Sequence, residues 1–65
     1  MGQKVELEEL LRLLGISEEL SYKISEAMKD AERMGLMQVA RILDTMRSYV
    51  DLLKRELEVK VEDYV

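Results

Sequence analysis

Apolar residues recur along most of this chain at intervals of three and four, the spacing that places them on one face of an α-helix. The repeat is most regular in the second half, where it runs without a miss through Leu36, Val39, Leu43, Met46, Val50, Leu53 and Leu57. Ile42 and Tyr49 widen this seam. The pattern predicts a long helix over residues 36–60 that packs its apolar face against other helices.

A shorter repeat of the same kind comes before it. Its members recur at steps of four and three and are Leu20, Ile24, Ala27, Ala31 and Met34. They predict a helix over residues 18–34. Gly35 separates the two repeats and favours a tight turn between antiparallel helices, although a lone Gly can also lie inside a continuous helix at a cost of about 1 kcal/mol.

The start of the chain predicts one more helix, over residues 4–14. Acidic residues lie in its first turns, where the helix dipole favours them. Gly15 suits the left-handed conformation that ends many helices, and Ser17 suits the N-cap of the next one. The sequence therefore predicts one all-α domain over residues 1–65. We expect a helical hairpin or three-helix bundle with a long C-terminal helix and coiled-coil-like association.

The tail, residues 58–65, departs from helical spacing. Val59 and Val61 alternate with charged residues, which is a strand signal. An isolated strand is not stable in water. The tail is therefore expected to add to the edge of a partner's sheet, to pair with residues 4–7, or to continue or fray as the end of the last helix.

Composition excludes most enzyme chemistry. The 65 residues contain neither His nor Cys, so a His-based catalytic triad, a thiol nucleophile, a zinc finger and a disulfide are all impossible. The glycines stand apart from one another, which excludes a glycine-rich phosphate loop, and bundle-type di-metal sites need Glu-x-x-His. We expect no enzymatic activity, no cofactor, no metal site and no small-molecule substrate.

Charge and hydropathy narrow the class of partner. The chain carries 14 acidic and 10 basic residues, a net charge of −4, which opposes binding to nucleic-acid phosphates. Its apolar runs are far shorter than the ~20 residues of a membrane span, and its start lacks the apolar segment of a signal peptide. We expect a cytoplasmic protein with neither membrane nor nucleic acid as partner. The Glu, Lys and Arg content resembles that of heat-adapted proteins, while five Met residues run against that interpretation.

One stretch resembles a known class of DNA-binding protein. The segment from Leu10 to Ser17, LLRLLGIS, resembles the first helix and turn of helix-turn-helix proteins. The resemblance implies that residues 18–28 form a recognition helix for the major groove, in a small regulator that dimerises through its C-terminal helix. Leu11 stands where the family usually has a small residue, and Ser21 where it has an apolar one. The two glutamates that begin the implied recognition helix would repel phosphate.

Helix length indicates that the chain works by binding another one. A helix from residue 36 to about 63 would be roughly 40 Å long, whereas a compact globule of this size is about 28 Å across. We therefore expect a non-catalytic oligomerisation or protein-interaction module, such as a small regulator or inhibitor. Its partner would be a second copy, in a homodimer or higher oligomer, or a larger protein. The predicted interface comprises Leu43, Met46, Tyr49, Val50, Leu53 and Leu57, with Arg47, Asp51 and Lys54 setting the register.

Overall fold

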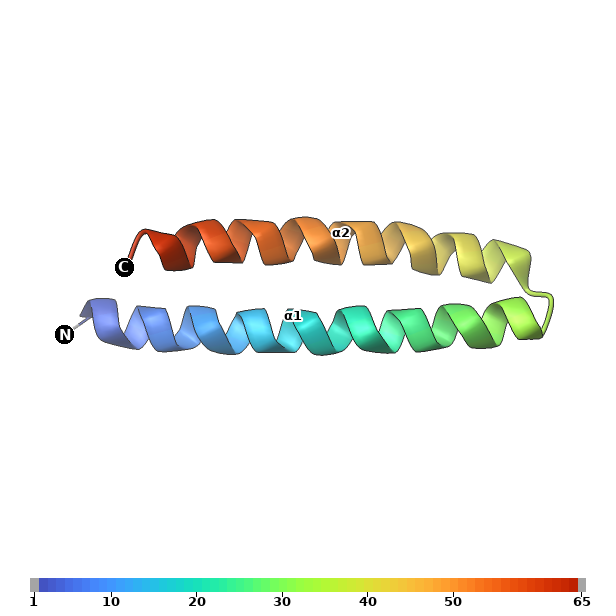
Figure 1. Cartoon of the computed structure of the whole chain (residues 1–65), viewed down its shortest axis with the longest axis horizontal. Helices are drawn as coiled ribbons and strands as arrows, with labels where there is room; N and C mark the ends of the chain where they lie inside the picture. Colours follow the sequence, from blue (N-terminus) through green and yellow to red (C-terminus); the bar gives the residue numbers. More distant parts are fainter. Residues whose placement is uncertain (1, 65) are drawn as a thin grey trace.

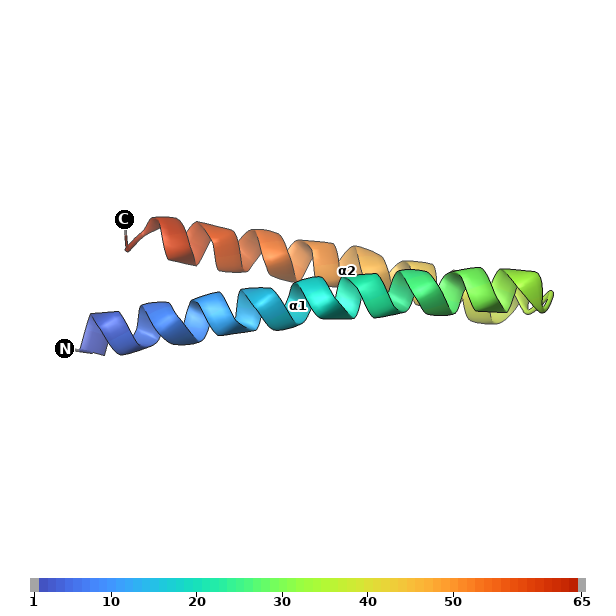
Figure 2. The ribbon, with the colours of Figure 1, turned by 60° about the horizontal axis from the view of Figure 1, so that its bottom comes forward.

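The protein folds as a hairpin of two long helices. The structure, a computed structural model, describes residues 2–64, and side chains from residue 5 onward. Helix α1 (Gly2–Arg33) and helix α2 (Met37–Glu62) run antiparallel and side by side, with both termini at one end, the open end (Figure 1). Figure 2 shows that the two helices cross at a shallow angle. The particle is 51 Å long and 14 by 13 Å across, which is little more than the length of α1 itself.

The turn between the helices forms where the sequence predicts it. Gly35 adopts a left-handed conformation, with φ of 76°. The backbone N–H of Gly35 donates to the carbonyl of Glu32 (3.0 Å), and that of Leu36 donates to the carbonyl of Ala31 (2.8 Å). These two bonds are the Schellman pattern that closes a helix around a glycine. The prediction of an antiparallel hairpin at Gly35 is therefore confirmed.

The predicted break at Gly15 is wrong, and there is no third helix in the described chain. Residues on both sides of Gly15 belong to α1, which is 32 residues long. The hydroxyl of Ser17 does not cap a new helix but donates back to the carbonyl of Leu14, at 2.8 Å. One Gly in a helix costs only about 1 kcal/mol. A break would have cost more, because it would have ended the packing of α1 along the full length of α2.

The same continuity removes the turn that the helix-turn-helix resemblance requires. Residues 10–28 lie within a single uninterrupted helix, so the described chain contains no separate recognition helix at that place. The tail is also helical as far as Glu62, and Val65 lies outside the described residues. Helix α2 continues to Glu62, and the backbone N–H of Asp63 still donates to the carbonyls of Val59 and Lys60. Of the alternatives for this segment, the structure adopts continuation of the helix.

The helices meet along one row of residues on each, which we call the inner seam. On α1 it comprises Leu7, Leu10, Leu14, Ser17, Ser21, Ile24, Met28 and Ala31; on α2 it comprises Ala40, Leu43, Arg47, Val50, Lys54, Leu57 and Val61, and it continues to Tyr64 just beyond the end of α2. These residues are buried or half-buried, and they step by three and four as in a coiled coil. The fully buried apolar residues are four: Ile24, Ala31, Ala40 and Leu57. The core is therefore a narrow strip.

Neither helix has a stretch that is both long enough and apolar enough to cross a lipid bilayer, as judged over the residues that the structure describes.

The two interior glycines provide a matched test of the hairpin. A Cβ added at either Gly15 or Gly35 would meet no atom within 4 Å, so the two sites differ in backbone conformation alone. Gly15→Ala should raise the free energy of unfolding by about 0.5–1 kcal/mol, because Ala favours the helix. Gly35→Ala should lower it by about 1–2 kcal/mol, because a Cβ is strained at positive φ. Urea unfolding of both variants measures this. A destabilising Gly15→Ala would contradict a continuous α1.

Candidate interaction surface

Both helices carry a second set of apolar side chains outside the inner seam. No other part of the described chain covers them. Eight large side chains in this set are between 43% and 68% exposed: Leu13, Ile16 and Leu20 on α1, and Val39, Ile42, Met46, Tyr49 and Leu53 on α2. We call these eight residues the apolar flank. They outnumber the fully buried apolar residues of the hairpin.

The two halves of the apolar flank lie on the same side of the hairpin. In both helices the flank includes positions directly before a seam residue, as Leu13 stands before Leu14 and Leu53 before Lys54. Two right-handed helices that face each other and run in opposite directions place such positions on one side. A shallow depression near the open end agrees with this geometry. It is lined by Leu13 from α1 and by Lys60, which is two helical turns beyond Leu53 on α2.

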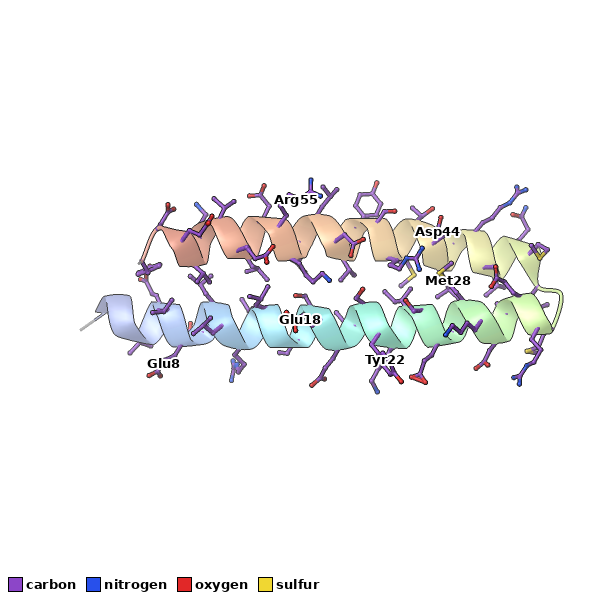
Figure 3. All side chains as sticks on the ribbon, in the orientation of Figure 1. Glu8, Glu18, Tyr22, Met28, Asp44 and Arg55 are labelled. Atoms are coloured by element: carbon purple, nitrogen blue, oxygen red, sulfur yellow. The ribbon has the colours of Figure 1, made fainter. Side chains whose placement is uncertain are left out.

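The opposite side of the hairpin is acidic. Seven exposed carboxylates each follow a seam residue by one position and form what we call the acidic flank: Glu8, Glu18, Glu32, Asp44, Asp51, Glu58 and Glu62. Glu32 and Asp44 line a second depression, together with Met28 and Ala40 of the inner seam. Figure 3 shows Met28 between the helices, whereas Tyr22 and Arg55 point away from the hairpin. The molecule therefore has one apolar side and one charged side, on which carboxylates outnumber the basic residues Lys29, Arg41 and Arg55.

Two basic residues interrupt the inner seam. The side chains of Arg47 and Lys54 are 40% and 30% exposed, and each forms an ion pair with the acid three residues earlier. The distances are 2.9 Å from Arg47 to Asp44 and 3.7 Å from Lys54 to Asp51. The aliphatic stems thus cover the seam while the charged groups reach the acidic flank, as long basic side chains commonly do. The contact between the two helices is therefore not continuously apolar.

The structure divides the nine residues of the predicted interface among three surfaces. Leu43, Arg47, Val50, Lys54 and Leu57 lie in the inner seam, against α1; Met46, Tyr49 and Leu53 lie on the apolar flank; Asp51 lies on the acidic flank. The seam residues are engaged within the hairpin. Only the three members on the apolar flank are free to contact another molecule with an apolar side chain.

Sequence reasoning missed the contribution of α1 to this surface. Leu13, Ile16 and Leu20 stand together on α1, but the break predicted at Gly15 assigned Leu13 and Leu20 to different helices and placed Ile16 in the link between them. The signal that could have joined them is the step of three and four that continues from Leu10 across Gly15 to Ile24. A repeat that keeps its phase across a glycine indicates a continuous helix.

The acidic side chains of the described residues are spread along the two helices. Among residues 2–64, no three acidic side chains come together in a way that could hold a metal ion. Neighbours seven residues apart on the acidic flank, such as Asp44 and Asp51, are separated by about 10 Å along the helix. Paired carboxylate catalysis needs two such groups to converge in one cleft with different environments.

One specific polar contact joins the helices at the open end. The Tyr64 hydroxyl of the α2 end donates a hydrogen bond to Oε2 of Glu6 on α1. This bond raises the pKa of the Tyr64 phenol above its ordinary value of 10.0, and loss of hydration and the nearby charges of Glu6 and Asp63 raise it further. The folded state therefore favours the neutral phenol.

The Tyr64 contact predicts a loss of this link in alkali. The stabilisation is fully present below pH 10.0, the ordinary pKa of the group, and is lost as the pH rises through the raised pKa, because the phenolate can no longer donate. Ultraviolet titration of the protein and of Tyr64→Phe measures it. The difference between the two curves belongs to Tyr64 and should have its midpoint above 10.0. A midpoint at or below 10.0 would show that the bond to Glu6 does not form.

Comparisons with protein-family models, with curated proteins and with solved structures found no match for this chain.

Proposed function

We propose that this protein is a non-catalytic protein-interaction module and that the apolar flank is its contact surface. The observation that carries the proposal is that the hairpin buries fewer large apolar side chains than it leaves exposed on one side. Four apolar residues are fully buried, whereas eight large ones remain 43–68% exposed on one side. Exposed apolar side chains scattered singly are ordinary, but a continuous set on one face is typical of an interaction site.

The size of the apolar flank supports this proposal. At about 25 cal/mol per Å², the roughly 1.5–3 kcal/mol gained by burying a large apolar side chain corresponds to about 60–120 Å², so eight that are about half exposed present roughly 250–500 Å². The largest apolar patch on a typical monomer is about 300–600 Å². On this small chain the apolar flank is therefore comparable with the largest patch of a typical monomer, which is often functional, and the hydrophobic effect favours covering it.

Charge restricts how a partner can approach. The acidic flank carries seven carboxylates, and two of them are paired with the seam residues Arg47 and Lys54. Together with the net charge of −4, this side repels acidic surfaces and phosphate groups. A protein partner that meets the apolar side avoids that repulsion. The charge distribution therefore favours one orientation of binding.

Photocrosslinking tests the proposal whatever the identity of the partner. A photoreactive amino acid introduced at Leu53, which is 45% exposed on the apolar flank, should form a discrete adduct in cells that naturally produce the protein. The same amino acid at Leu52, which is 52% exposed on the outer edge of α2, is the matched control and should form none. Gel mobility and mass spectrometry identify the adducts. Absence of adducts at Leu53, or equal adducts at both positions, would refute the apolar flank as a contact surface.

A further inference from the structure

We propose that the partner on the apolar flank is a second copy of this chain, so that two hairpins form an antiparallel four-helix bundle. This inference rests on the proposed function and adds the identity of the partner. A two-fold symmetric dimer brings the same surface of both copies together. The apolar flank must therefore fit against a second copy of itself. Three properties of the flank decide this: the direction in which its apolar residues point, its area and the charges around it.

The most regular apolar repeats of the two helices point toward the same side of the hairpin. On α1 this repeat comprises Leu20, Ile24, Ala27, Ala31 and Met34; on α2 it comprises Val39, Leu43, Met46, Val50, Leu53 and Leu57. Each repeat alternates between the inner seam and the positions directly before it, on the side of the apolar flank. At about 100° per residue, its mean direction lies roughly 60° from the line to the sister helix.

That oblique direction is the one expected in a four-helix bundle. Each helix of such a bundle has two neighbours, and the bundle axis lies diagonally between them. In a two-helix protein, the same repeat would point directly at the sister helix. Because both helices of this hairpin aim their repeats toward the same side, the missing neighbours must come as a pair of helices. A second hairpin supplies that pair.

Area and charge agree with this occupant. The roughly 250–500 Å² of the apolar flank is close to the apolar share, about 57%, of the ~800 Å² that each partner contributes to a stable interface of standard size. The charged residues that border the flank are of both signs, with Lys23 and Lys60 among Glu6, Glu9, Asp30 and Glu56. Lysines of one copy can therefore meet carboxylates of the other when two copies approach through this side. Approach through the acidic flanks would place like charges together.

Sedimentation equilibrium of the full chain tests the proposal, with two neighbouring variants. The protein should sediment at twice the 7.6 kDa of one chain at tens of micromolar. Leu53→Glu places a charge in the interface twice per dimer and should raise the dissociation constant at least about 100-fold. Leu52→Glu adds the same charge to an equally exposed neighbour outside the face and should leave the constant within about threefold of the unmodified protein. A monomer at hundreds of micromolar, or equal effects of the two variants, would overturn the dimer.

Crosslinking supplies a readout that does not depend on a charged variant folding. Because the chain has no Cys, Met46→Cys carries a single thiol on the apolar flank and Thr45→Cys a single thiol on the outer edge of α2. A short bismaleimide should join two Met46→Cys chains and leave Thr45→Cys chains single. If neither variant crosslinks, the second copy is wrong. If the photoreactive amino acid at Leu53 then formed adducts whose mass is not that of two copies of this chain, the proposed function would stand with a different partner. If it formed no adducts, both the second copy and the proposed function would be wrong.

Discussion

Two helices that pack side by side can cover only one strip of each other's surface, and the remaining features of this protein follow from that constraint. Each helix presents its inner seam to the other, and the turn at Gly35 holds the pair antiparallel. Among the side chains that the structure describes, only four apolar ones become buried in this arrangement. The other apolar side chains of residues 5–64 stay at least partly in contact with water, and eight of them gather on one side of the hairpin.

The strip that the hairpin buries is not the most apolar strip available. The inner seam contains Arg47 and Lys54, which reach across it toward carboxylates, and the fully buried hydroxyl of Ser17. Small residues such as Ala31 and Ala40 let the helices approach closely but contribute little apolar area. A single core in a chain of this size rarely provides more than about 3–5 kcal/mol. A seam of this composition gives the isolated hairpin little stability, and this is consistent with the proposed association through its uncovered side.

Part of this fold can be predicted from sequence, and the errors have a physical cause. Gly35 interrupts a helical repeat where a turn fits, and the turn forms there. Gly15 carries similar turn chemistry, but long-range packing along α2 outweighs the local preference at that position. The repeat of α2 is correctly predicted as helical, but the face that α2 turns toward α1 is not. Apolar residues of α2 extend around more than one face of the helix, so the repeat alone does not determine which face lies against α1. The contact with α1 determines it, and that contact places Arg47 and Lys54 in the inner seam. The sequence consequently predicts the candidate surface at Met46, Tyr49 and Leu53 and misses it on α1.

The concentration dependence of thermal unfolding tests most directly whether the folded hairpin depends on a second chain. If two chains fold together and separate on unfolding, a hundredfold increase in concentration stabilises the dimer by about 2.7 kcal/mol. For a particle of about 130 residues, this corresponds to a rise in Tm of about 10 °C. Circular dichroism at two concentrations is sufficient to measure it. A Tm that stays constant over that range would contradict the account, because it would show that the hairpin folds alone with its apolar flank in water.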